Sequence, residues 1–225
     1  GDSLDRPAED SENTGTFYKN DTQCIQGVNY LYNSPWYDFQ RGFISVGEVL
    51  SGNYYWGGSP YLNFSVNGTD EYLINMSYSL WAVNGHCNTV IGYLKGASAS
   101  EAVKKQCIGE ALTWKAMAYF FLVRTFGEVP IIHDNTTVIG NGSYNDVYKV
   151  QRADVYEYIV MTLEEAMKNL KEAGRTSFDS TDRIDYYSAE ALLAKVYLTK
   201  SGVSGSRSEE DLAKAAEYAK DVIDN

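Results

Sequence analysis

The stretch AVKKQCIGEALTWKAMAYFFLVRTFGEVP, residues 102–130, decides the fold. Its apolar side chains recur at steps of three and four positions, the spacing that places residues on one face of an α-helix. They are Val103, Cys107, Ala111, Trp114, Ala118 and Phe121. Ser98 followed by Glu101 predicts a capping box at the start of this helix. Gly127 and the following Val129-Pro130 predict its end.

Helical periodicity also dominates the rest of the chain. It predicts helices over 16–33, 70–96, 151–174, 188–200 and from Ser208 to the end, and residues 41–50 are compatible with a short helix. Segment 188–200 is apolar nearly all round, which is typical of a helix covered by neighbours on several sides. The last helix carries one apolar stripe, formed by Leu212, Ala215, Ala216, Ala219, Val222 and Ile223.

A short pattern recurs between two of these helices. Ala118-x-x-Phe121-Leu122 is repeated as Ala194-x-x-Tyr197-Leu198. Small residues of this kind let paired helices approach closely, as in tetratricopeptide repeats, so we expect Ala118 and Ala194 to be buried. Long insertions at 128–151 and 174–187 make the repeats irregular. The predicted fold class is all-α, with irregular tetratricopeptide-like helical repeats and long loops.

Composition and charge exclude several classes of function. The chain has 225 residues and a formal net charge of −11 at pH 7. A negative field of this kind repels phosphate backbones and anionic lipid surfaces, so we expect no nucleic-acid partner. The longest uninterrupted apolar run, 116–123, is far below the roughly 18 residues that a membrane span requires.

The residues also lack the minimal parts of common enzyme sites. Only two histidines are present, His86 and His133, and the sequence contains no HExxH, no GxSxG and no glycine-rich phosphate loop. A cluster of carboxylates, Asp179, Asp182 and Asp185, could hydrolyse a glycoside, but a solvated loop is the more ordinary explanation. The three cysteines allow at most one disulfide and have no metal-ligand spacing. We therefore expect no enzyme, no cofactor and no metal.

A binding site is the better-supported hypothesis. Tyr54, Tyr55, Trp56 and Tyr61 lie in a Gly/Pro/Asn-rich loop at 51–68, where no helical stripe requires large rings. Trp and Tyr rings stack on the apolar faces of sugars, while Asn and Tyr polar groups satisfy sugar hydroxyls. The alternative is that Trp56 anchors the loop in the helical core, because Trp is usually highly buried.

Specific stretches resemble the SusD/RagB family of outer-membrane nutrient-binding lipoproteins. Residues 109–122, running into Phe126-Gly127-Glu128-Val129-Pro130-Ile131, are similar to the signature helix of that family and its exit. The similarity continues with Arg152, Val155, Tyr156 and Ile159, and with the repeat helix at 189–198. Leu4-Asp5 with Pro7 is similar to the segment that follows the lipid-bearing cysteine. Asn88 falls where members tend to carry Asn. Two positions depart from the family: Lys115 stands in place of Arg, and Thr162 in place of Asp.

The resemblance implies a non-catalytic, surface-exposed protein that binds an oligosaccharide or polysaccharide and works with a TonB-dependent, SusC-like outer-membrane transporter. It implies attachment to the outer membrane through a lipid anchor that this chain does not carry. Residues 1–15 would be a polar leader and 16–225 the amino-terminal helical domain of a longer fold. The rival hypothesis is a helical-repeat scaffold that binds only protein partners.

Overall fold

The computed structural model describes residues 17–32, 71–129, 131, 151–177, 183–203 and 208–225. The regular elements of these residues are all helices: α2 (Asp21–Tyr32), α5 (Glu71–Lys95), α6 (Glu101–Phe126), α8 (Arg152–Glu172), α9 (Tyr186–Lys200) and α10 (Glu209–Asp224). The all-α prediction is therefore confirmed. The predicted short helix at 41–50 and the predicted loop at 51–68 lie outside the described residues.

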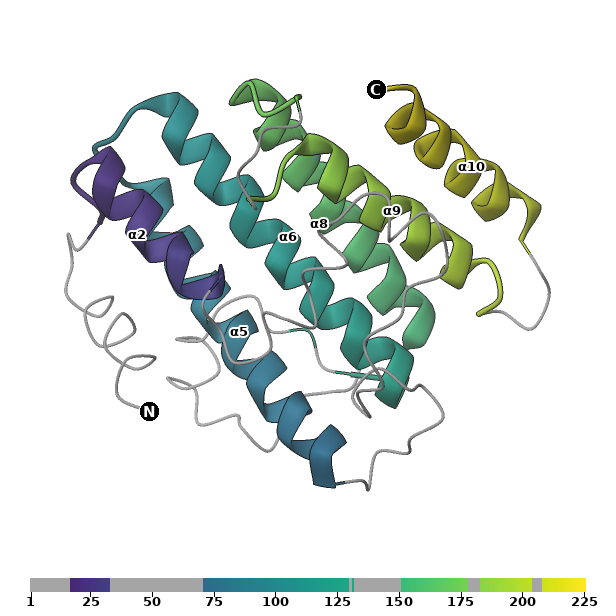
Figure 1. Cartoon of the computed structure of the whole chain (residues 1–225). Coiled ribbons are helices and arrows are strands. Elements are labelled where there is room, and N and C mark those ends of the chain that lie inside the picture. The colour runs from purple at the N-terminus through teal and green to yellow at the C-terminus, as the bar shows by residue number, and fades with distance from the viewer. Residues whose placement is uncertain (1–16, 33–70, 130, 132–150, 178–182, 204–207) are drawn as a thin grey trace.

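The helices form a layered array in which each one packs on its neighbours in the chain (Figure 1). Helix α6 is the centre, because α2, α5 and α8 all pack against it. Helix α9 packs on α8, and α10 packs on α9 at the edge of the array (Figure 1). This stacking of successive helices is the irregular repeat arrangement that the sequence predicts.

The N-cap of α6 lies two residues after the predicted one. Ser100, not Ser98, is the N-cap, and its side-chain oxygen accepts a hydrogen bond from the Val103 amide. The prediction was wrong because the Ser98 amide donates to the Tyr18 carbonyl, in the segment before α2. Ser100 is held in turn by Asp21, whose carboxylate accepts from the Ser100 amide at 2.7 Å and from its hydroxyl at 3.1 Å. One contact thus fixes the starts of α2 and α6 together.

Other helix ends follow local signals that the sequence contains. Gly127 ends α6 with a φ of 75°, a conformation that favours glycine. Ser208 caps α10 by accepting from the Asp211 amide, as predicted. Helix α9 begins at Tyr186, two residues before the prediction, because the Asp185 side chain accepts from the Ser188 amide and caps it. Helix α2 begins at Asp21, where Asn20 accepts from the Gln23 amide.

The core confirms the small-residue argument for the paired helices. Ala118 and Ala194 are both buried, and nearly every residue of α6 from Gly109 to Val123 is enclosed. The second copy of the repeat is less complete than the first, because Leu122 is buried while Leu198 is 46% exposed. The stripe on α10 is also only partly buried: Ala215 and Val222 face α9, but Ala216 and Ile223 are exposed. Val129, after α6, is also buried.

The cysteines are free and buried in this core. Cys24, Cys87 and Cys107 form no disulfide. Burial raises the pKa of the Cys87 thiol to about 12, so the thiol stays protonated and behaves as a small apolar group. Within the part of the chain that the structure describes, no helix is long and apolar enough to cross a membrane.

Candidate functional site

The four aromatic residues predicted to bind ligand, Tyr54, Tyr55, Trp56 and Tyr61, lie outside the described residues. The structure does place the elements on either side of them. The chain leaves the described part after the last residue of α2, Tyr32, and returns at the first residue of α5, Glu71. Both helices pack on α6. The segment that carries the predicted site thus connects two helices that both pack on α6.

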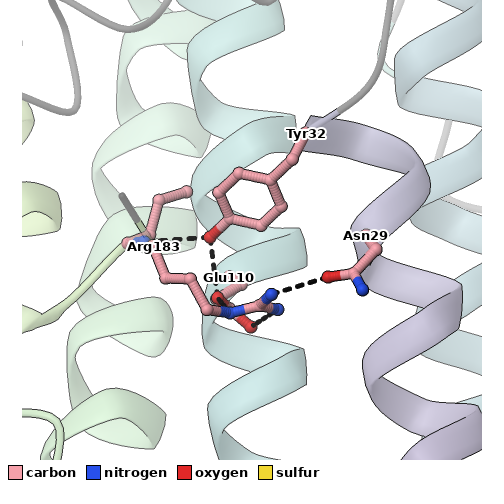
Figure 2. A network of polar contacts seen from close by, with 5 residues as sticks. Asn29, Tyr32, Glu110 and Arg183 are labelled. Atoms are coloured by element: carbon pink, nitrogen blue, oxygen red, sulfur yellow. Dashed lines mark hydrogen bonds and ion pairs between the residues drawn. The ribbon is translucent and has the colours of Figure 1, made fainter. Parts of the chain in front are cut away.

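The end of α2 is held by a buried ion pair between Glu110 on α6 and Arg183, which precedes α9 (Figure 2). Arg183 Nε donates to Glu110 Oε1 at 2.8 Å, and Nη2 donates to Oε2 at 3.0 Å. This two-point geometry is the strongest arrangement of a guanidinium and a carboxylate. Because the Glu110 side chain is fully buried, its charge depends on Arg183 for compensation.

Helix α2 joins this pair through two side chains, as Figure 2 shows. The Tyr32 hydroxyl donates to Glu110 Oε1 at 2.7 Å and accepts from the Ile184 amide at 2.9 Å. Arg183 Nη1 donates to Asn29 Oδ1 at 2.6 Å. We call this set of residues, Asn29, Tyr32, Glu110, Arg183 and Ile184, the Glu110 network. It ties together α2, α6 and the segment before α9.

The electrostatics of the Glu110 network show what it does. Burial, and then the charge of Glu110, hold the pKa of Tyr32 well above its ordinary value, so the phenol stays neutral and remains a donor. Burial lowers the pKa of Arg183, but the hydrogen bonds and charge of Glu110 outweigh it and raise that pKa overall. The polar groups of the network are engaged with one another. The Glu110 network is therefore an anchor for α2, the helix that precedes the segment with the predicted site.

Sequence reasoning did not single out these residues. One signal was present: Glu110 lies within the helical face defined by Cys107, Ala111 and Trp114. A carboxylate on an otherwise apolar face must be paired when it is buried. Its partner could not be named from the sequence, because Arg183 is 73 positions away.

A second buried polar contact joins two positions that the sequence analysis did single out. Lys115 Nζ on α6 donates to Asn88 Oδ1 on α5 at 2.7 Å. Lys115 Nζ also lies 5.5 Å from the centre of the Tyr158 ring on α8. Burial lowers the pKa of Lys115 to about 8. Lys115, which departs from the family pattern, thus contacts Asn88, which matches that pattern.

The side chains with catalytic potential are used for structure where they are described. His86 Nε2 lies 3.2 Å from the Gly27 carbonyl oxygen, and burial lowers the pKa of its ring. Asp185 caps α9, while Asp179 and Asp182 lie outside the described residues. No group of three or more His, Cys, Asp or Glu side chains able to hold a metal occurs among the described residues.

Comparison with known families gives a match that covers most of the chain. A SusD-like family model described as "Starch-binding associating with outer membrane" matches residues 47–198. A SusD-like protein of Bacteroides ovatus is 33% identical over 231 residues, which covers 99% of this chain and 41% of the relative. The chain thus spans well under half the length of that relative.

Solved structures agree with this match. A crystal structure with a xylogluco-oligosaccharide is 31% identical, with a TM-score of 0.66, and covers 90% of this chain and 40% of that one. A SusD-like carbohydrate-binding protein from Bacteroides fragilis has a TM-score of 0.68 at 20% identity, covering 93% of this chain and 41% of that one. At that lower identity the likeness supports the fold alone.

Proposed function

Because this chain belongs to the SusD-like family of starch-binding proteins associated with the outer membrane, we propose that it is part of a non-catalytic glycan-binding protein. Its ligand is an oligosaccharide or polysaccharide, which it delivers to a TonB-dependent transporter. It acts at the cell surface, where a lipid anchor attaches the full-length protein to the outer membrane. The observation that carries this proposal is the family match over 47–198, which spans the predicted aromatic segment as well as α5, α6 and α8.

The proposed ligand residues are Tyr54, Tyr55, Trp56 and Tyr61. Their rings offer flat apolar faces to sugar C–H groups, and their phenol and indole groups can hydrogen-bond to sugar hydroxyls. The crystal structure of a 31% identical relative with a xylogluco-oligosaccharide supports a glycan as the class of ligand. The Glu110 network anchors α2, the helix that precedes this segment in the chain.

The proposed protein is longer than this chain, whose residues 16–225 form its amino-terminal helical domain. The 41% coverage of the Bacteroides ovatus relative supports this proposal. A glycan site formed partly by the remaining sequence would be incomplete in the fragment. Binding is therefore to be measured on the full-length protein.

The test is isothermal titration calorimetry of the full-length protein against a panel of purified glycans, including starch, xyloglucan and laminarin oligosaccharides. For a glycan that binds, Trp56→Ala should weaken affinity by more than about 1 kcal/mol, roughly fivefold or more, because a stacked ring contributes to the complex. The melting temperature should stay nearly unchanged. Phe126→Ala, which removes a partly exposed ring at the end of α6, is the matched control and should leave affinity unchanged.

Three outcomes would contradict parts of this proposal. A loss of about 3–5 kcal/mol of stability in Trp56→Ala would show that the ring is a core anchor. No binding to any glycan, with retention of a protein partner on purification, would favour the protein-binding scaffold instead. Unchanged affinity in Trp56→Ala would remove the assignment of the site while leaving glycan binding itself in place.

A further inference from the structure

Helix α2 packs on α5 as well as on α6 (Figure 1). His86, on α5, lies in the contact between α2 and α5 and is only 5% exposed. Its Nε2 atom lies 3.2 Å from the Gly27 carbonyl oxygen on α2. The centroids of its ring and of the Tyr30 ring, also on α2, are 4.4 Å apart. His86 therefore joins α5 to the middle of α2.

The contact with Gly27 fixes which nitrogen of the neutral His86 ring carries the proton. A carbonyl oxygen only accepts hydrogen bonds, so Nε2 must be the donor. In a neutral imidazole the other nitrogen, Nδ1, then has no proton and can only accept. The Nδ1 atom of His86 is buried and has no hydrogen-bond partner among the described residues. The neutral ring thus makes the contact with α2.

A second proton on the His86 ring would have to bind at Nδ1. It would create a buried cation whose new N–H group has no acceptor among the described residues, and both changes cost free energy. The Gly27 carbonyl and the Tyr30 ring would partly compensate the charge. Burial is the larger effect, because it lowers the pKa of His86 from its ordinary value of 6.5 despite the hydrogen bond to Gly27.

The two ends of α2 are held by contacts that do not involve His86. At its start Asp21 accepts hydrogen bonds from Ser100, and at its end Tyr32 donates to Glu110. We propose that His86 is an acid-sensitive contact: protonation of its Nδ1 atom releases the middle of α2 from α5, while both ends of α2 stay attached to α6. The contact lies between the helices that precede and follow the segment with the predicted aromatic site.

The direction of the pH response follows from the lowered pKa of His86. The folded state holds the second proton of this ring less tightly than the unfolded chain does. The stabilisation of the α2–α5 contact is therefore fully present above the ordinary pKa of 6.5 and is lost as the pH falls through the lower folded value.

The titratable groups on the helices around His86 do not produce the same response. On α6, Lys115 has a pKa of about 8 and stays mostly protonated between pH 5 and pH 7. On α5, the Cys87 thiol has a pKa of about 12 and stays protonated. Glu110 on α6 and Asp21 on α2 are engaged at the two ends of α2. No charged side chain of the described residues contributes to the lowered pKa of His86, whose first cause is burial.

The test is hydrogen exchange of the full-length protein at pH 7 and pH 5, corrected for the intrinsic pH dependence of exchange. Protection of amides in 24–31 should fall by about five- to twentyfold at pH 5, whereas amides in 155–167 of α8 should change little. His86→Gln should abolish this fall, because the Gln amide can donate to the Gly27 carbonyl and does not titrate. His133→Gln makes the same chemical change at the other histidine of the chain and should retain the fall.

A direct titration of His86 keeps the proposal testable if His86→Gln does not fold. Exchange of the imidazole C2 hydrogen, followed by mass spectrometry of the peptide that contains His86, reports the protonation midpoint of this ring. The midpoint should lie below 6.5 in the folded protein and return to about 6.5 in urea. The proposal would be overturned by a folded-state midpoint at or above 6.5, by unchanged protection of 24–31 between pH 7 and pH 5, or by an undiminished fall in His86→Gln. The proposal does not depend on glycan binding.

Discussion

The ammonium of Lys115 donates to the side-chain carbonyl of Asn88, and this 2.7 Å contact links α6 to α5. Lys115 is buried, and burial is the first cause of its lowered pKa. A compact ammonium on a flexible stem loses hydration here and gains one amide oxygen and the face of a Tyr ring. Keeping the buried Lys115 side chain charged therefore costs free energy, and this cost depends on pH.

We expect Lys115 to stabilise the protein more at high pH than at neutral pH. Its pKa in the folded state, about 8, lies below its ordinary value of 10.5, so the folded state binds fewer protons. Stability therefore rises with pH between these values. In urea unfolding from pH 7 to pH 10, the free energy of unfolding of the unmodified protein should gain about 1–3 kcal/mol relative to Lys115→Met. For the control Lys168→Met, at an exposed position of α8, the difference in free energy of unfolding from the unmodified protein should stay constant over this pH range. A constant difference for Lys115→Met as well would refute the expectation.

The Glu110 network predicts a graded series of stability losses. Arg183→Met leaves the buried Glu110 carboxylate without a cation and should cost about 3–5 kcal/mol. Tyr32→Phe removes one hydroxyl and leaves the Ile184 amide without its acceptor, which should cost about 1–3 kcal/mol. The double variant Arg183→Met/Glu110→Gln should recover part of the first loss, because the buried charge is gone. Equal losses in Arg183→Met and the double variant, measured by urea unfolding, would show that charge is not the cause.

Ala118 and Ala194 should tolerate no added volume. Replacing either with Leu inserts three carbon atoms into a closed core and should destabilise by about 1–3 kcal/mol. Ala216→Leu makes the same change on the exposed side of α10 and should alter the free energy of unfolding by less than about 0.5 kcal/mol. Thermal unfolding of the three variants checks this. If Ala118→Leu were as mild as Ala216→Leu, close packing at the α6 repeat position would be wrong.

Two helix-interior glycines should respond to alanine with opposite signs. A Cβ added at Gly109 would lie 2.6 Å from Leu170 Cγ, so Gly109→Ala should push α8 away from α6 and destabilise by about 1–3 kcal/mol. A Cβ at Gly92 meets nothing within 4 Å. Gly92→Ala should therefore stabilise by about 0.5–1 kcal/mol through helix propensity. Denaturant midpoints measure both, and a stabilising Gly109→Ala would disprove the close approach.

The fold could be predicted from the sequence because its decisive signals are local. Apolar spacing places α6, α8 and α9, and Ser208 and Gly127 mark helix ends through contacts within a few positions. The errors occurred where distant residues decide. Ser98 has a side chain suited to capping, but its amide donates to the Tyr18 carbonyl. Asp21 holds Ser100 at the start of α6 instead. Likewise the apolar spacing of α10 does not reveal that Ile223 has no described neighbour to cover it and is 72% exposed.

The candidate site was less accessible to such reasoning. The aromatic cluster at 54–61 stands out by composition, but ring stacking on a sugar depends on placement in space, which no local spacing encodes. The sequence singled out Lys115 and Asn88 as two separate positions and did not indicate that they contact each other. The pairing of Glu110 with Arg183 was not indicated at all, because it joins α6 to the segment before α9, 73 positions away.

The Glu110 network also has a consequence for the order in which the chain folds. Its members lie far apart in the sequence, since Arg183 follows Glu110 by 73 positions and Asn29 by 154. Contacts of such long range form later than the local contacts of a helix, because a long loop has to close first. Until Arg183 is in place, Glu110 would be a carboxylate without a cation, and burial in that state is costly. We therefore expect the packing of α2 and α6 around Glu110 to be completed only together with the segment before α9.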